Sequence, residues 1–193
     1  MADQALAAQS AFSELKPVQS AALSIEVRDG LTIASIAAGK GKAADVRAVM
    51  QKAFGIDLPE RPLRVEGGGI SVIWHGPDQW LAIAPRGAGD RDLESELAAL
   101  LDGIAAVTDQ SDGRAVVRLS GSCVRDVLAK GVPVDLHDSA FASNGVAITH
   151  ASHIGIVLWQ IDETPTFEIA LFRSFADSFA HWLAHASAEF TAG

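Results

Sequence analysis

The chain repeats one order of elements in its two halves. Residues 31–58 read LTIASIAAGKGKAADVRAVMQKAFGIDL, which is a β-rich run, a glycine, a helical pattern and then Gly-Ile-Asp-Leu. Residues 115–136 read AVVRLSGSCVRDVLAKGVPVDL, which is a β-rich run, a glycine, a shorter helical pattern and then Gly-Val-Pro-Val-Asp-Leu. Each stretch is followed by a predicted strand pair and an amphipathic helix. Two βαββα-like units of this kind indicate an internal duplication.

The duplication limits the folds that the chain can adopt. Each unit is too small to bury both faces of its own elements, so we expect the two units to share one body. We predict the α+β class, with duplicated strand-helix-strand units that form two sheets covered by helices. The expected division is an N-terminal segment over 1–22 and a single duplicated domain over 23–193, with halves of about 23–106 and 107–193.

Alternating apolar residues and turn signals place the strands. Two strand-like runs within 23–38 are separated by Asp29-Gly30, a pair that predicts a hairpin turn. Further strands are expected over 115–119, on either side of the His150–His153 corner, and in TPTFEIALF near the end of the chain.

Helical periodicity places the helices. A short helix is expected from about Asp3 to Leu15, and another over 122–130. The three longer helical patterns have these residues on their predicted buried faces: Val46, Val49, Met50 and Ala53; Leu93, Leu97, Leu100 and Leu101; and Phe175, Phe179, Trp182 and Leu183.

Two of the four tryptophans flank one predicted turn. Residues 69–85 read GISVIWHGPDQWLAIAP, in which Trp74 and Trp80 lie on either side of Gly76-Pro77-Asp78. Proline and aspartate are typical turn residues, so the stretch predicts a hairpin with the two indoles paired across its strands. Packing against a helix or a partner is favoured over a ligand platform, because aromatic side chains mostly bury area. Trp74 and Trp80 are therefore the candidate interface residues.

Composition excludes several classes of function. The chain has 24 acidic and 15 basic residues, a net charge of −9, and no basic stripe, which argues against nucleic-acid binding. Its single cysteine, Cys123, excludes an internal disulfide and a multi-cysteine zinc site. No apolar run approaches the length of a membrane span, and the N-terminal sequence has no basic start of a secretory signal. We expect a soluble cytoplasmic protein that contacts neither membrane nor nucleic acid.

Metal and phosphate motifs are weak. GKGKAAD lacks the spacing of a P-loop, and EGGG lacks the dinucleotide fingerprint. His181 and His185 have metal-ligand spacing on a predicted helix, but no third ligand is evident. Cys123 lies at a predicted helix start without an identifiable base. No metal site and no catalytic residue is predicted.

Three stretches resemble the γ subunit of heterotetrameric sarcosine oxidase. They are WHGPDQWLAIAP, DQSDGRAVVRLSGSCVRDVLAKGVPVDLHDSAF and TFEIALFRSFADSFAHWL, and the resemblance runs from about Leu63 to Leu183. That family is in turn similar to the folate-binding domain of the glycine-cleavage aminomethyltransferase. The resemblance therefore implies the fold of that domain.

The resemblance implies a non-catalytic assembly subunit with α, β and δ subunits as partners. The complex that it points to demethylates sarcosine oxidatively, giving glycine, hydrogen peroxide and methylenetetrahydrofolate. FAD, FMN, NAD, zinc and tetrahydrofolate are expected in the other subunits and none in this chain. Alternatives are the γ subunit of a related N-methyl amino acid dehydrogenase, and a free-standing folate-binding or aminomethyltransferase-like protein. A folate-fold protein with another partner is a weaker alternative.

The residues that the aminomethyltransferases use for folate are only partly matched. In GGGISVIW, Ser71 and Val72 stand where the resemblance would place an essential acidic residue. A hydroxyl group does not supply a fixed negative charge at neutral pH. Glu168 in TFEIALF matches the folate-contacting glutamate, although QIDETPTF lacks the aromatic-glycine loop that precedes it in the enzymes. Glu168 is either a remnant of a folate site or, as we favour, a strand glutamate that faces solvent or a basic group.

Overall fold

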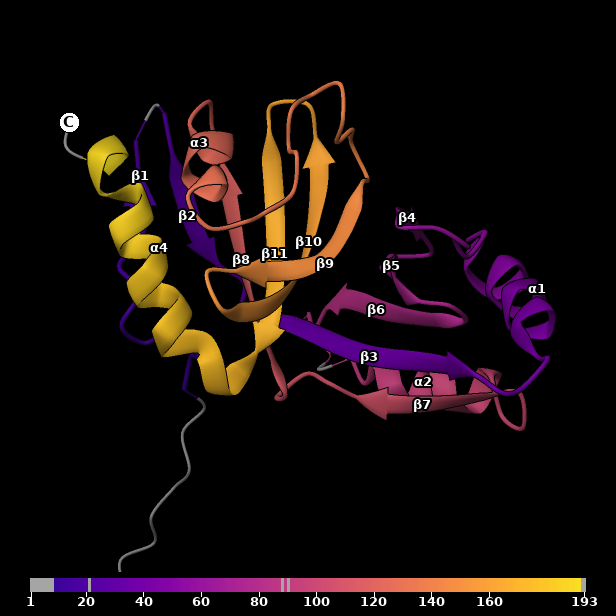
Figure 1. The fold of residues 1–193 in the computed structure, drawn as a ribbon. Helices are drawn as coiled ribbons and strands as arrows, with labels where there is room; N and C mark the ends of the chain where they lie inside the picture. Colours follow the sequence, from indigo (N-terminus) through magenta and orange to yellow (C-terminus); the bar gives the residue numbers. More distant parts are fainter. Residues whose placement is uncertain (1–8, 21, 88, 90, 192–193) are drawn as a thin grey trace, which may run out of the picture.

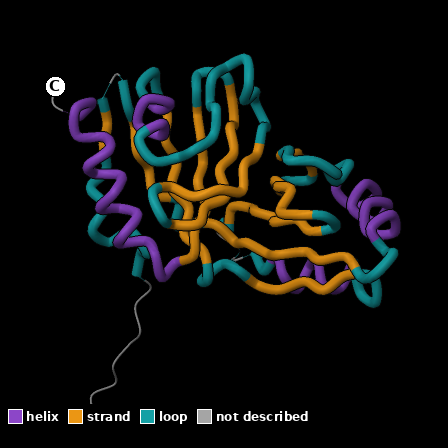
Figure 2. Tube along the Cα trace, in the orientation of Figure 1, coloured by secondary structure: helices purple, strands orange, loops and turns teal. Residues whose placement is uncertain are grey.

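A computed structural model describes residues 9–20, 22–87, 89 and 91–191. Its strands form two sheets, and every strand pair within the described residues is antiparallel (Figures 1 and 2). One sheet has the order β1-β2-β8-β11-β10-β9, with bounds Val18–Gln19, Ser24–Val27, Arg114–Ser120, Thr166–Phe172, Ile154–Asp162 and Val146–Ala151. The other has the order β4-β5-β6-β3-β7, with bounds Arg64–Gly67, Ile70–Gly76, Gln79–Pro85, Leu31–Ala38 and Ala105–Asp109.

The helices of the described residues occupy equivalent positions in the two halves of the chain. They are α1 (Ala43–Phe54), α2 (Leu93–Leu100), α3 (Val124–Ala129) and α4 (Ala176–Thr191), the last preceded by the 3₁₀ turn η1 (Arg173–Phe175). In Figure 1, α3 and α4 lie with the six-stranded sheet, and α1 and α2 lie with the five-stranded sheet. The predicted α+β class, with two helix-covered sheets, is confirmed.

The two halves of the chain exchange their first strands. Apart from the short β1, the order β2-β8-β11-β10-β9 in one sheet matches the order β7-β3-β6-β5-β4 in the other. β2 precedes β3 in the chain but pairs with β8 of the second half. β7 precedes β8 in the chain but pairs with β3 of the first half. Each sheet is therefore completed by a strand from the other half.

This exchange makes the predicted hairpin at Asp29-Gly30 wrong. β2 pairs with β1 and β8, whereas β3 pairs with β6 and β7, so the two runs never pair with each other. The backbone between them crosses from one sheet to the other, and Gly30 O accepts a hydrogen bond from Arg86 N at 2.9 Å. A turn signal reports a local bend, but the partner of each strand is set by contacts distant in sequence.

Buried apolar residues of the described chain form three clusters. One lies between the six-stranded sheet and α3 and α4, and a second lies between the five-stranded sheet and α1 and α2. A third joins the inner faces of the two sheets and includes Ile73, Leu81, Val157 and Trp159. The sheets also meet where Leu63 bridges Gly145, just before β4 and β9. Two equivalent strands therefore begin side by side.

Some residues predicted to be buried are exposed. Leu100 is 41% and Phe175 is 47% exposed, and Ala53 is also exposed. Leu100 is the last residue of α2, and Phe175 lies in the 3₁₀ turn before α4. At both places the regular α-helix begins or ends, so the helical period does not correctly predict which side chains are buried there. The helix predicted from about Asp3 lies partly outside the described residues, and residues 11–14 within it form turns instead.

Candidate functional site

The tryptophan hairpin forms as its sequence predicts. β5 and β6 pair with Trp74 directly opposite Trp80, and a bulge follows between Trp74 and Gly76. Asp78 has φ 57° and Gly76 has φ 144°, positive angles that aspartate and glycine tolerate better than most residues.

The two indoles have different environments. Trp80 is 2% exposed in the cluster beneath α1 and α2, and its Nε1 donates to Pro59 O at 2.9 Å. Trp74 is only half-buried. Of the two candidate interface residues, the structure places Trp80 in the core of the chain and leaves Trp74 partly accessible.

Glu168 lies on the inner face of the six-stranded sheet. It sits on β11, between Arg118 of β8 and Trp159 of β10, and is only 7% exposed. Arg28 Nε donates to its Oε1 at 3.2 Å, and Arg118 donates from Nε at 3.0 Å and from Nη2 at 2.8 Å. Within the described chain these hydrogen bonds all end on the same carboxylate oxygen. The buried charge is therefore compensated by two guanidinium groups.

A third arginine reaches this region from the five-stranded sheet. Arg64 of β4 is 8% exposed, and burial lowers its guanidinium pKa while the charge of Glu168 opposes that shift. Its Nη1 donates to Asn144 Oδ1 at 3.0 Å, and its Nη2 donates to Ser71 Oγ at 3.2 Å and to Glu66. Ser71 therefore binds Arg64 through a neutral hydroxyl, at the position where the resemblance would place a carboxylate.

These side chains line a cavity of about 470 Å³ between the sheets. Its polar wall consists of Arg28, Arg64, Arg118, Glu66, Ser71 and Glu168. The buried carboxylate is already engaged, and the remaining ionic groups are mainly guanidinium donors. No acid-base pair with a free carboxylate faces this cavity among the described residues. The polar contacts of the cavity join arginine side chains to Glu66 and Glu168 in one ion cluster.

The arginines of this cluster were missed in the sequence. Arg118 interrupts the apolar run AVVRLS, and Arg64 is the first residue of β4 in the other sheet. A basic residue within a β-rich run is a signal for a buried partner, because an unpaired charge inside a sheet core is costly. The sequence around Arg28 does not indicate a buried partner, because Arg28 approaches Glu168 only when β2 pairs with β8 of the other half.

The weaker candidate sites lie apart from this cluster. The rings of His181 and His185 stack edge to face with centroids 4.6 Å apart, and no group of three potential metal ligands occurs among the described residues. Cys123 is a half-buried free thiol at the start of α3, with Ser122 Oγ at 4.0 Å. No helix in the described part of the chain is long and apolar enough to cross a membrane.

Comparison with known proteins gives consistent matches. The family model described as "Sarcosine oxidase, gamma subunit family" matches residues 39–189. The sarcosine oxidase subunit gamma of Corynebacterium sp. (strain P-1) is 40% identical over 146 residues, covering 74% of this chain and 70% of that protein. The subunit gamma of Arthrobacter sp. is 38% identical over 146 residues, with the same coverage of 74% and 70%.

Solved structures show the same relationship. A chain of the heterotetrameric sarcosine oxidase from Corynebacterium sp. U-96 matches with a TM-score of 0.82 and 28% identity, covering 96% of this chain and 97% of that one. The glycine cleavage system aminomethyltransferase T from Bartonella henselae matches with a TM-score of 0.59 and 16% identity, covering 85% of this chain and 46% of that one. The second match concerns the fold alone.

Proposed function

This chain belongs to the sarcosine oxidase gamma subunit family, and on that premise we propose that it is the non-catalytic assembly subunit of a heterotetrameric sarcosine oxidase. The reaction of that complex is the oxidative demethylation of sarcosine to glycine, with formation of hydrogen peroxide and methylenetetrahydrofolate. The family match over residues 39–189 supports the assignment to the complex. The non-catalytic role is supported by the chemistry of the cavity between the sheets.

The observation that carries the non-catalytic role is the engagement of Glu168. A carboxylate that recognises the paired N–H donors of a pterin-like ring needs two free acceptor oxygens. In this chain Arg28 and Arg118 both donate to Oε1, so one of the two oxygens is already occupied. Ser71 contributes no charge on the opposite sheet. These contacts support the interpretation that we favour, in which Glu168 is a strand glutamate that faces basic groups and whose carboxylate joins neighbouring strands.

The proposed partners are the α, β and δ subunits of the complex, in the cytoplasm. FAD, FMN, NAD, zinc and tetrahydrofolate are assigned to those subunits and none to this chain. The match to a chain of a heterotetrameric sarcosine oxidase supports the proposal that this chain has several partner subunits. Trp74, which is half-buried at the hairpin, remains a candidate for contact with one of these subunits.

The test is reconstitution of the complex with and without this chain. Coexpression with the other three subunits is expected to yield a flavin-containing complex in which this chain is stoichiometric. Leaving it out is expected to lower the yield of assembled complex. In parallel, calorimetric titration of the isolated chain with a reduced folate is expected to show no binding. Folate binding by the isolated chain, or normal assembly of a stable and active complex without it, would contradict the proposal.

A further inference from the structure

The strands at the edges of the two described sheets differ in how the edge is protected. β1 has two residues, β4 carries Arg64 and Glu66, and β7 ends in the exposed Asp109. β9 has six residues, VAITHA, with no Asp, Glu, Lys, Arg or Pro and no register shift against β10. Short length, charge, proline and bulges are the features by which edge strands avoid pairing with other chains. The edge of β9 has none of them.

The hydrogen bonds at the start of β9 show which backbone groups face away from its sheet. Val146 N donates to Pro62 O at 3.3 Å, on the side of the strand opposite β10. Alternate residues of an antiparallel edge strand direct their N–H and C=O groups to the same side. The groups of Ile148 and His150 therefore also point away from β10, and no other segment in the described part of the chain pairs with them.

The face of the sheet beside this edge is open. Ile148 pairs with Val157 of the cluster between the sheets, yet it is 49% exposed. In the next row His150 pairs with Gly155, both are exposed, and a Cβ built on Gly155 would have no atom within 4 Å. The register of β10 and β11 places Phe172 beside Gly155, and Phe172 is 51% exposed. Ile148, His150, Gly155 and Phe172 form what we call the inner-face patch.

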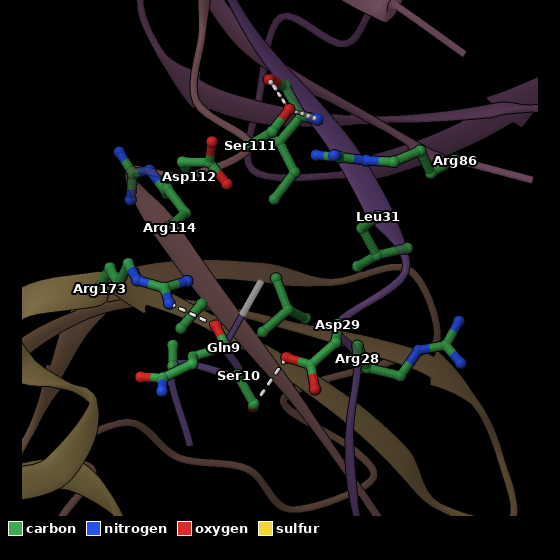
Figure 3. A pocket seen from close by; sticks show the side chains of 14 residues that line it. Gln9, Ser10, Arg28, Asp29, Leu31, Arg86, Ser111, Asp112, Arg114 and Arg173 are labelled. Atoms are coloured by element: carbon green, nitrogen blue, oxygen red, sulfur yellow. Dashed lines mark hydrogen bonds between the residues drawn. The ribbon is translucent and has the colours of Figure 1, made fainter. Parts of the chain in front are cut away.

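Phe172 marks the end of the inner-face patch that lies away from β9. Arg114 of β8 stacks on its ring, with Cζ 4.5 Å from the ring centroid. Arg114 and Asp112 also line a hollow of about 270 Å³ on that far side (Figure 3). The described residues that line this hollow include none from β9 or β10, so the inner-face patch is a separate surface.

We infer that another subunit of the complex adds an extended, uncharged segment to the free edge of β9 and covers the inner-face patch with apolar side chains. Free N–H and C=O groups along an edge strand are matched by a further strand, whose alternate side chains lie against the face of the sheet. The absence of charged side chains on β9 and the exposure of Ile148 and Phe172 match apolar side chains. The inference rests on the proposed assembly function.

A second copy of this chain fits the edge less well. Antiparallel pairing of two β9 strands about Ile148 would set Val146 of one copy opposite His150 of the other, where Val146 N already donates to Pro62 O. Each copy also carries a net charge of −9, so two copies repel each other. The occupant that we infer is therefore a segment of a different subunit.

The test of the edge compares two substitutions at Ile148 in the coexpressed complex. Proline removes the outward N–H, whereas valine keeps it, and the two side chains have the same number of carbon atoms. Because this N–H does not bond to β10, Ile148→Pro is expected to melt within a few degrees of the wild type. Ile148→Pro is expected to bind the other subunits at least about tenfold more weakly, and the control Ile148→Val to bind normally.

A substitution at Gly155 tests the face without changing the edge. Gly155→Arg places a charged side chain in open space, so the isolated chain is expected to keep its melting temperature. The charge would then lie among the apolar side chains of the partner, and binding is expected to weaken by a similar factor. The matched control, Gly155→Ala, is expected to bind normally.

Hydrogen exchange of single amides gives a direct readout. The amides of Ile148 and His150 are expected to exchange rapidly in the isolated chain and slowly in the complex. The amide of Thr149, which faces Ile156 of β10, is expected to exchange slowly in both.

Three outcomes would contradict these proposals. Normal assembly of both folded variants, or unchanged exchange at Ile148 and His150 on assembly, would overturn the docking surface. A dimer of the isolated chain that Ile148→Pro dissociates would overturn it in favour of a second copy. Failure of the wild type to assemble with the other subunits would instead refute the proposed function itself.

Discussion

At the scale of single residues, Glu168 is a buried carboxylate held by two arginines from different parts of the chain. The residue is 7% exposed, and its carboxylate contacts Arg118 on the neighbouring strand and Arg28 just after β2. A buried ion pair adds little net stability, because desolvation of the charges offsets their attraction. The contact with Arg28 instead favours one arrangement of the chain, since it forms only when β2 joins the six-stranded sheet.

The tryptophan pair gives the residue-scale prediction. Trp80→Ala is expected to lower the free energy of unfolding by about 3–5 kcal/mol, because it leaves a void in a packed core and an unpaired Pro59 carbonyl. Trp74→Ala is expected to cost less than about 2 kcal/mol, because that indole is only half-buried. Urea denaturation of the two isolated variants measures both values. Equal losses would show that the two indoles share one environment.

At the scale of elements, the glycine that follows each repeated strand is explained by the strand exchange. Gly121 has φ 112°, and a Cβ built there would lie 2.4 Å from Ala22 O, just before the exchanged strand β2. Gly39 donates from its N–H to Ile104 O at 2.8 Å, just before the exchanged strand β7. In both halves the glycine therefore lets the incoming strand pass close to the end of the repeated strand.

A substitution series at these glycines tests the explanation. Gly121→Ala is expected to cost about 2–4 kcal/mol, because it combines a strained backbone with a clash against main-chain atoms. Gly39→Ala is expected to cost less, since its nearest atom would be 3.2 Å away. Gly155→Ala in β10 is the control, with no atom within 4 Å and an expected change of about 0.5 kcal/mol or less. Comparable melting temperatures for all three variants would remove the steric basis of the argument.

At the scale of the whole molecule, the exchange of β2 and β7 couples the two halves. Each sheet contains a strand from the other half, and a third apolar cluster fills the space between the sheets. The matching element order supports our proposal that the halves at about 23–106 and 107–193 are duplicated units of a single domain. Neither unit has a complete sheet without the other.

The coupling predicts a single unfolding transition. Scanning calorimetry of the isolated chain is expected to give a calorimetric enthalpy equal to the van't Hoff enthalpy, because removing β2 or β7 from its sheet disrupts both halves at once. Two separated transitions, or a van't Hoff enthalpy well below the calorimetric one, would show that the halves unfold independently.

Patterns in the amino-acid sequence were sufficient to predict the class of the fold and most of its local elements. The repeated strand-glycine-helix order predicted the duplication, and the hairpin pairs Trp74 with Trp80 across its strands as predicted. These features depend on residues close in the chain, through helical period, turn chemistry and cross-strand neighbours. The match of Glu168 to a folate-contacting position, suggested by TFEIALF, stays a prediction.

The pairing of the strands and the partners of the buried charges depend on contacts between distant segments of the chain. The bend at Asp29-Gly30 is a local property, but whether it ends in a hairpin or in another sheet depends on where β8 and β6 lie. The partners of Glu168 follow from that choice, since Arg28 is 140 residues away and Arg118 is 50 residues away. Pairing distant segments has an entropy cost that only the burial of the assembled sheets offsets. Short-range sequence patterns do not indicate whether burial outweighs this entropy cost for a given pair of distant strands.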